Sequence, residues 1–204
     1  MAYIGQAPAN KPVEGSDISS TIITGQTALS TAPADTDEFL ISDAGVLKRL
    51  DASFIGGANT PMFLVRKSST QDVSDASSTQ VTFDTEVIDT DNAFASNTFT
   101  VPSGKAGKYL ISCQLTMHVS TATELEYSTI QIYKNDSQLV NSQWVAYNNP
   151  GMYQTPCLSV IMDLSAGDTL KVYTYIDVGA GTPRVLGESS RFATWFQGYK
   201  LIGV

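Results

Sequence analysis

The fold of this chain is decided by the stretch Tyr109-Leu-Ile-Ser-Cys-Gln-Leu-Thr-Met117. Large apolar residues or cysteine occupy every second position from Tyr109 to Met117, and mostly polar residues lie between them. Successive side chains of a β-strand point to opposite faces of a sheet, so a period of two predicts a half-buried strand. The stretch therefore indicates a sheet with one face in a hydrophobic core.

The same alternation recurs later in the chain. Residues 158–164 carry apolar side chains at every second position, and residues 170–176 repeat the pattern after the turn Ser165-Ala-Gly-Asp168. No long window has apolar residues at three- and four-residue spacing between helix caps. Frequent short strands separated by Gly, Pro, Asn and Asp turns predict an all-β sandwich or jelly roll.

Composition divides the chain near residue 60. Of the 204 residues 42% are hydrophobic, which is enough for a sizeable core, but only Tyr3, Phe39 and Phe54 among the aromatic residues precede Pro61. Large apolar side chains supply most of the burial energy, so the first part cannot build a core alone. We predict a segment at residues 1–58, a linker at 59–61 and a globular domain at 62–204.

The first segment is expected to be an extended arm followed by a short β-hairpin. Residues 1–35 are rich in Pro, Ala, Ser, Thr and Gly, whereas residues 37–50 form two apolar runs around Asp43-Ala-Gly45, with Gly45 at positive φ. A lone hairpin is marginally stable in water. It therefore needs neighbouring copies or a host surface to bury its apolar side chains. The residues expected to anchor this segment are Tyr3, Ile4, Ile18 and Phe39.

Charge and residue counts exclude several function classes. Twelve Lys and Arg against 20 Asp and Glu give a net charge of −8, which repels nucleic-acid phosphates and anionic lipid headgroups. One histidine and two cysteines argue against a zinc site. No export signal or membrane-spanning run is present. We expect no nucleic-acid partner, no membrane insertion and no cofactor.

Six short motifs follow one another in the second part of the chain. They are Val81-Thr-Phe-Asp84, Phe99-Thr-Val-Pro102, Gly107-Lys-Tyr-Leu110, Ile132-Tyr-Lys-Asn135, Leu164-Ser-Ala-Gly-Asp168 and Phe196-Gln-Gly-Tyr-Lys-Leu201. In this order they resemble the globular head of the complement C1q and tumour-necrosis-factor-like family. The resemblance covers most of residues 62–204 and implies a ten-stranded jelly roll that forms a homotrimer and acts as a binding or scaffold module without catalysis.

The N-terminal segment resembles the attachment modules of bacteriophage tail-fibre and related virion proteins. The resemblance is carried by Ala2-Tyr-Ile-Gly-Gln-Ala-Pro-Ala-Asn-Lys-Pro-Val13, Ser16-Asp-Ile18, Ile23-Thr-Gly-Gln-Thr-Ala-Leu29 and the hairpin. It implies that residues 1–58 attach to other proteins of a virion. No collagen repeat or heptad stalk is present, so the length allows only a short spike or a surface decoration.

The two cysteines are expected to be free. Cys113 falls on the apolar face of its strand and Cys157 on the face opposite its apolar neighbours, so the two thiols point to opposite sides of a shared sheet. We expect Cys113 to be buried and inert.

The single histidine is interpreted as a surface or trimer-contact residue. His118 follows Met117 on the polar face, with Glu124 and Glu126 a short loop away. A pH-sensitive or metal-assisting role is the alternative. No Gly-x-Ser-x-Gly elbow or Ser-His-Asp context is present, so we expect no enzymatic activity.

Acidic residues cluster at Asp84, Glu86, Asp89 and Asp91, beside Asn92. Oxygen donors at this density could hold calcium, but the spacing lacks the Gly and Glu of a recognised calcium loop. We interpret the cluster as a solvated strand and turn, without a metal.

Tyr133, Tyr173 and Tyr175 lie opposite the aliphatic faces of their strands and are candidate trimer contacts, with loop cover or sugar stacking as alternatives. Two loops at the ends of the sandwich supply candidate receptor-binding residues, because binding residues often lie on such loops. These candidates are Asn148, Asn149, Tyr153 and Thr182.

The sequence thus predicts a virion protein of a bacteriophage. It would be a short trimeric tail fibre or spike that presents a jelly-roll head to a host receptor or glycan. A capsid decoration or head-fibre protein with the same fold is the first alternative. A polysaccharide depolymerase is the second, although such spikes usually need a long groove and a much larger domain.

Overall fold

The computed structural model describes residues 25, 27, 33–34, 36–52, 59–121, 124–146 and 150–202. The chain divides into two units, Met1–Gly56 and Gly57–Val204. Every strand pair between named strands is antiparallel. None of the described segments forms a helix long and apolar enough to cross a membrane.

The first unit contains the predicted hairpin. Strands β1 (Glu38–Asp43) and β2 (Val46–Asp51) pair along their whole length. The two turn residues Ala44 and Gly45 have φ angles of 49° and 82°. A two-residue hairpin turn with both residues at positive φ matches the right-handed twist of the strands. The predicted hairpin and the positive φ of Gly45 are therefore confirmed, whereas most of the predicted arm lies outside the described residues.

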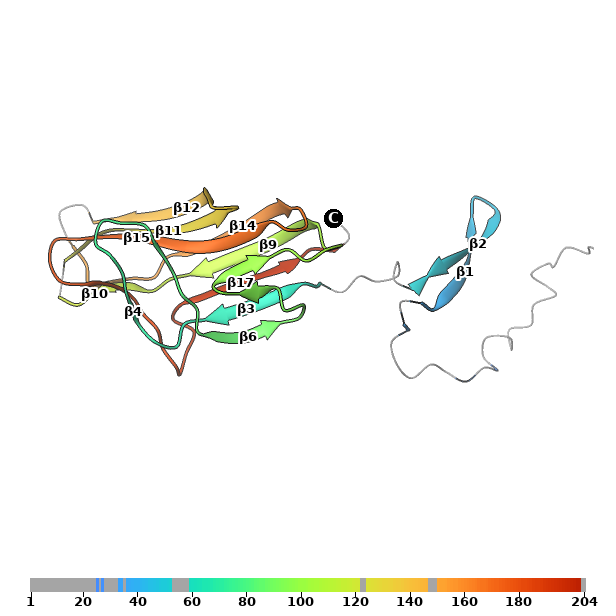
Figure 1. Ribbon diagram of the computed structural model, residues 1–204, viewed down its shortest axis with the longest axis horizontal. Coiled ribbons are helices and arrows are strands. Elements are labelled where there is room, and N and C mark those ends of the chain that lie inside the picture. The colour runs from blue at the N-terminus through green and yellow to red at the C-terminus, as the bar shows by residue number, and fades with distance from the viewer. Residues whose placement is uncertain are drawn as a thin grey trace, which may run out of the picture. The chain divides into compact units, whose positions relative to one another are not determined.

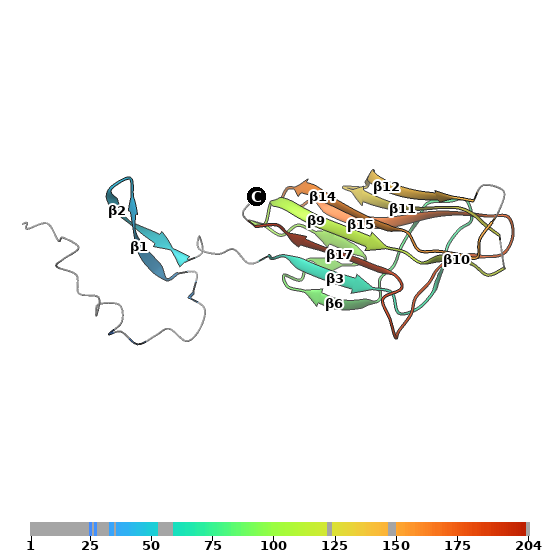
Figure 2. The same ribbon diagram turned by 180° about the vertical axis from the view of Figure 1, so that it is seen from behind.

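Two sheets make up most of the second unit (Figures 1 and 2). The five-stranded sheet has the strand order β14 (Cys157–Leu164), β9 (Gly107–Gln114), β17 (Trp195–Lys200), β3 (Met62–Arg66) and β6 (Thr85–Asp89). The six-stranded sheet has the order β12 (Ser137–Val145), β11 (Leu125–Lys134), β15 (Thr169–Val178), β8 (Thr98–Thr100) and β7 (Phe94–Ala95), and β5 (Thr79–Gln80) pairs with β15.

The strand order is that of a jelly roll. Strand β9 lies between β14 and β17, its partners from far along the chain, and β15 lies between β11 and β8. The chain crosses repeatedly from one sheet to the other, as from β8 to β9, from β14 to β15 and from β15 to β17. Two antiparallel sheets linked in this way define a double-sheet jelly roll. The predicted all-β jelly roll is confirmed, but the described residues form a six-stranded and a five-stranded sheet, and a further sheet of four strands, where ten strands were expected.

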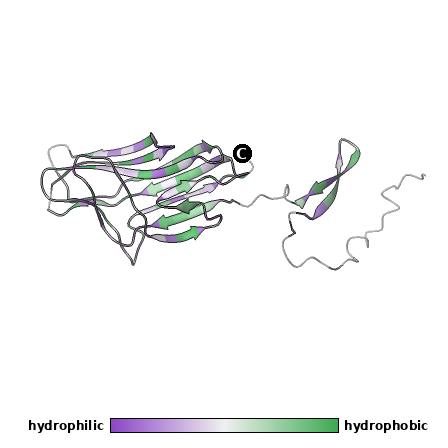
Figure 3. Ribbon diagram, in the orientation of Figure 1, coloured by the Kyte–Doolittle hydropathy of each residue, from purple (hydrophilic) through white to green (hydrophobic). Residues whose placement is uncertain are grey.

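The core lies between these two sheets. Phe63 of β3 packs against Phe99 at 4.4 Å and against Phe196 at 4.9 Å between ring centroids. Alternate residues of β9 and β15 point into the same cluster, including Tyr109, Ile111 and Cys113. Figure 3 shows hydrophobic residues along much of β3, β6 and β9. Burial of these apolar groups holds the two sheets together.

A smaller third sheet was not predicted. Its order is β13 (Tyr153–Gln154), β10 (Met117–Val119), β16 (Pro183–Val185) and β4 (Gln71–Asp72). Strands β10 and β4 lie at one end of the sandwich, and β3 begins and β17 finishes at the other end (Figure 1). The third sheet is therefore at the far end from the point where the chain enters the sandwich.

The predicted single strand at 109–117 is wrong in one respect. Strand β9 ends at Gln114, and β10 begins at Met117 in a different sheet. The amide of Leu115 donates to the carbonyl of Pro156, and the amide of Thr116 donates to the Thr194 hydroxyl. These bonds take Leu115 and Thr116 out of the ladder, although Leu115 and Met117 stay in the core with Cys113.

Candidate functional site

The two cysteines are free, as predicted. Cys113 is buried and pairs in register with Leu158, while Cys157 is exposed and pairs with Gln114. Neighbouring residues on one strand point to opposite faces, so the thiols lie on opposite sides of the five-stranded sheet. Burial raises the pKa of the Cys113 thiol well above its ordinary value. The prediction of a buried Cys113 is confirmed.

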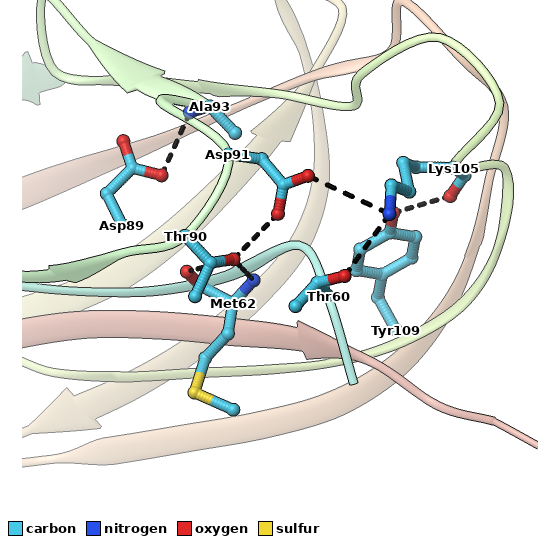
Figure 4. Close-up of polar contacts among 8 residues, drawn as sticks. All are labelled: Thr60, Met62, Asp89, Thr90, Asp91, Ala93, Lys105 and Tyr109. Carbon is cyan, nitrogen blue, oxygen red and sulfur yellow. Dashed lines mark hydrogen bonds and ion pairs between the residues drawn. The ribbon is translucent and has the colours of Figure 1, made fainter. Parts of the chain in front are cut away.

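The acidic cluster holds loops together (Figure 4). The two carboxylate oxygens of Asp89 accept hydrogen bonds of 2.9 Å from the amides of Ala93 and Phe94. Asp91 accepts a bond of 2.7 Å from the Thr90 hydroxyl and lies 3.8 Å from the Lys105 ammonium. Each of these two acids therefore has partners within the chain that fix the loop after β6.

Asp84 has a similar structural role. It accepts bonds from the amides of Ser68 and Ser69 at 2.6 and 3.1 Å and from the Ser69 hydroxyl. Although burial opposes ionisation, these hydrogen bonds hold the pKa of Asp84 well below its ordinary value. Most of the cluster lies on a strand and the turn after it, as predicted, and Asp84 is exposed, but Asp84 and Asp89 also accept backbone hydrogen bonds that the sequence did not indicate. Among the described residues, no three or more His, Cys, Asp or Glu side chains are grouped so as to hold a metal ion.

The third sheet carries a row of four polar and aromatic side chains. His118 of β10 lies directly opposite Tyr153 of β13 and Arg184 of β16, and Arg184 lies opposite Asp72 of β4. Residues paired in this way share one face of a sheet. The rings of Tyr153 and His118 stack at 5.1 Å with an angle of 15° between their planes. The Arg184 guanidinium donates to Asp72 at 2.7 Å.

His118 is buried, so the prediction of a surface or trimer-contact histidine is wrong. Only 8% of the residue is exposed, because Tyr153 covers the imidazole on this face of the sheet. The prediction failed because nothing in the sequence around His118 indicates that β13 pairs with β10 and places Tyr153 over the imidazole. Within the described residues, neither ring nitrogen has a hydrogen-bonding partner. Burial lowers the pKa of His118, which favours the neutral imidazole.

A surface pocket of about 510 Å³ adjoins this row. Tyr153 and Thr155 line it together with Thr116, Glu188 and Arg191. The Arg191 guanidinium lies 3.2 Å from the Glu188 carboxylate, and the hydroxyls of Thr116 and Thr155 are 3.2 Å apart. The pocket therefore combines an aromatic ring, an ion pair and two hydroxyl groups.

Two of the predicted receptor-binding residues lie near each other at this end of the sandwich. Tyr153 is half exposed and lines the pocket. The amide of Thr182 donates to the Ser120 hydroxyl at 2.7 Å, immediately beyond the strand that contains His118. Asn148 and Asn149 lie outside the described residues. Sequence reasoning missed Glu188 and Arg191, because nothing in their spacing links them to residues 153–155.

The candidate trimer-contact tyrosines lie on the outer face of the six-stranded sheet and pack against one another. Tyr133 contacts Tyr173 at 4.3 Å, and Tyr127 contacts Tyr175 at 5.6 Å between ring centroids. Each of the four rings is partly buried. The structure thus gives these tyrosines partners within one chain, and their contact with another subunit stays a prediction.

The outer face of the five-stranded sheet is more apolar than the sequence suggested. Ile161 pairs with Leu110, Leu110 with Tyr199, and Tyr199 with Met62, so the four side chains form a continuous row across four strands. We call these four residues the outer apolar row. Ile161 is 61% exposed.

A second apolar feature lies on the same sheet. Leu64 and Trp195 line a crevice of about 250 Å³ together with Phe192 and Gln197. The guanidinium carbon of Arg66 lies 5.4 Å from the centroid of the Phe192 ring. The outer apolar row and this crevice lie on the same face of the sandwich, where the next paired row carries the polar residues Ser159, Ser112 and Gln197. Apolar side chains on an exposed face are a common feature of interaction sites.

The hairpin of the first unit exposes apolar residues on both faces. Phe39 lies on the face that also holds Val46, and Leu40 lies on the opposite face with Leu47. All four side chains are exposed. Phe39 was predicted to anchor the segment, and the other predicted anchors, Tyr3, Ile4 and Ile18, lie outside the described residues.

Comparisons with known proteins identify a similar fold but no family. Neither the protein families nor the curated proteins searched contain a match to this chain. Among solved structures, the globular domain of zebrafish complement 1qA protein is similar with a TM-score of 0.48 and 16% sequence identity. The similarity covers 70% of this chain and 98% of the zebrafish domain. We take the jelly-roll assignment from the strand order and packing of this chain itself.

Proposed function

We propose that the protein is a structural protein of a bacteriophage particle, a short trimeric tail fibre or spike. Residues 1–58 attach to other virion proteins, and the jelly roll is presented to a receptor or glycan on the host surface. The mechanism is binding, without a covalent step. A capsid decoration or head-fibre protein with the same fold is the second candidate, and position on the particle separates the two.

The observation that carries this proposal is the apolar outer face of the five-stranded sheet. Burying a large apolar side chain contributes about 1.5–3 kcal/mol relative to leaving it in water. In the outer apolar row Ile161 is exposed, whereas Met62, Leu110 and Tyr199 are already half-buried and would gain only part of this energy. The crevice beside Phe192 adds further apolar side chains to the same face. Association of like subunits covers this surface, and closed symmetric assemblies are the usual outcome.

The hairpin supports attachment. Its apolar side chains lie on both faces, so a single partner surface on one side cannot cover them. Two strands alone are marginally stable in water, and burial between partners stabilises them. The assignment to a bacteriophage rests on the resemblance of the N-terminal sequence to attachment modules of virion proteins.

The proposal is tested first by the solution mass of the full chain, measured by light scattering after size-exclusion chromatography. We expect three times the chain mass of 21.9 kDa. A monomer at all concentrations tested would overturn the trimeric fibre. Mass spectrometry of purified virions and gold-labelled antibodies then locate the protein, and its absence from the particle would overturn the virion assignment.

Attachment is tested by the double variant Leu40→Ser and Leu47→Ser. These changes remove the exposed apolar pair from one face of the hairpin without touching the jelly roll. We expect the mass to stay trimeric while incorporation into particles, measured by immunoblot of purified virions, is lost. Normal incorporation would contradict an anchoring role for this face of the hairpin.

A further inference from the structure

The Tyr153 side chain lines the pocket and lies against the His118 imidazole. One face of the ring stacks on the His118 imidazole, with ring centroids 5.1 Å apart. The side chain is nonetheless 50% exposed and lines the pocket of about 510 Å³. Because His118 covers one face of the ring, the opposite face is the one available to a ligand.

Residues of the third sheet hold the Tyr153 ring in place. Strand pairing sets His118 directly between Tyr153 and Arg184, and the Arg184 side chain is tied to Asp72 at 2.7 Å. The imidazole is buried with both nitrogens unpartnered within the described residues. The planar imidazole stacks on the Tyr153 ring and restricts its position beside the pocket.

The polar groups of the pocket suit a ligand with several hydroxyl groups. A hydroxyl both donates and accepts hydrogen bonds. Arg191 has five N–H donors, of which the contact with Glu188 at 3.2 Å uses one terminal nitrogen. The Glu188 carboxylate supplies acceptors. The Thr116 hydroxyl donates to the Ala193 carbonyl at 2.8 Å and lies 3.2 Å from the Thr155 hydroxyl, so Thr155 is the more accessible acceptor of the two. Adjacent hydroxyl groups on a sugar ring can bond to such paired donors and acceptors. Hydrogen bonds to the charged groups of Arg191 and Glu188 are stronger than those between neutral groups.

The charges and the strand lengths argue against other ligands. Glu188 and Arg191 neutralise each other, and the net charge of −8 repels polyanions. The edge strand β13 has only two residues, so a peptide could add little ladder pairing there. An apolar ligand would displace water from the hydroxyls and the ion pair without replacing the hydrogen bonds to that water, which costs binding energy.

We propose that this pocket binds a neutral sugar ring, stacked by its C–H face on Tyr153 and bonded through its hydroxyls to Glu188 and Arg191. The negative face of an aromatic ring attracts weakly positive C–H groups, and a sugar ring presents such groups on one side. This inference rests on the proposed function, and it names the ligand class and the residues of the binding head.

The test uses the full chain and saturation-transfer NMR with a panel of methyl glycosides. The panel contains glucose, galactose, mannose, rhamnose and N-acetylglucosamine, with the open-chain polyol sorbitol and triglycine as non-ring probes. We expect at least one glycoside to bind and neither sorbitol nor triglycine to do so. Titration with that glycoside is then repeated with the variants.

The variants separate stacking from hydrogen bonding. Tyr153→Ala should weaken binding by about tenfold or more, whereas Tyr153→Phe, which keeps the ring, should retain it. Arg191→Gln should also weaken binding. The matched control is Arg49→Gln, because Arg49 is 72% exposed and paired with a glutamate, and Arg191 is 73% exposed and paired likewise. Melting temperatures establish that each variant is folded.

Three results would overturn the inference. They are the absence of binding by every glycoside, binding of triglycine in place of a sugar, and sugar binding that survives both Tyr153→Ala and Arg191→Gln. The mass of the wild-type chain and its presence on the virion are measured separately. A failed sugar site with an intact trimeric virion protein is therefore distinguishable from failure of the proposed function.

Discussion

The two outer faces of the sandwich differ in how their large side chains are partnered. On the six-stranded sheet, Tyr133 packs on Tyr173 and Tyr127 on Tyr175. On the five-stranded sheet, Ile161 is 61% exposed at the edge of the outer apolar row. Aromatic residues opposite an aliphatic face are therefore not enough to locate an interface. Exposed aliphatic residues lie on both sheets, Ile161 on β14 and Leu139 and Val145 on β12, so the choice between the two faces needs a direct test.

The largest effect is expected from the inner side of the five-stranded sheet. A Cβ at Gly198 would lie 2.5 Å from Ile111 Cδ1 and 2.8 Å from Phe63 Cε1. Overpacking of a core costs about 1–3 kcal/mol, so Gly198→Ala should lower the free energy of unfolding in urea by that amount. The control Gly151→Ala meets no atom closer than 3.7 Å. Equal stability of the two variants would contradict the tight packing described here.

An intermediate effect is expected from the tyrosines of the six-stranded sheet. Aromatic pairs contribute about 0.5–1.5 kcal/mol beyond their buried area, so a double-mutant cycle with Tyr133→Ala and Tyr173→Ala should give a coupling energy of that size. The solution mass should not change. Zero coupling together with loss of the trimer would instead make these tyrosines the subunit contact.

The smallest effect is expected at the turn that joins the two sheets, between β14 and β15. Asp168 accepts hydrogen bonds from Lys134, Asn135 and the amide of Ser165, and these interactions lower its pKa to about 2. A carboxyl whose pKa falls on folding contributes stability above the unfolded pKa of about 4, and the contribution is lost as the pH falls from about 4 to about 2.

The Asp168→Asn variant checks this sign. Its melting temperature should be lower than that of the wild type at neutral pH, and the gap should close on acidification to about pH 2. A gap that stays constant over this range would show that ionised Asp168 does not stabilise the fold.

Much of the fold could be predicted from the sequence because its signals are local. The period of two identified the strands around Tyr109 and Leu170, and Asp43-Ala-Gly45 identified the hairpin turn. Cys113 and Cys157 were placed correctly on opposite faces because the alternation holds within β9 and β14. Each of these inferences needs only neighbouring residues.

The surface pocket and the outer apolar row could not be predicted, because both depend on which strands pair. His118 is covered because β13 pairs with β10 and places Tyr153 over the imidazole. Leu110 and Ile161 each lie between core-facing residues of their own strands. Only their register with each other and with Tyr199 reveals a continuous row.

We propose that subunits meet at the outer face of the five-stranded sheet, and not at that of the six-stranded sheet. The most direct test compares the solution masses of Ile161→Glu and Leu139→Glu, since Ile161 is 61% exposed on β14 and Leu139 is 55% exposed on β12. We predict that Ile161→Glu lowers the mass to that of one chain while Leu139→Glu leaves the trimer intact. A trimer that survives Ile161→Glu and is lost with Leu139→Glu would contradict the account.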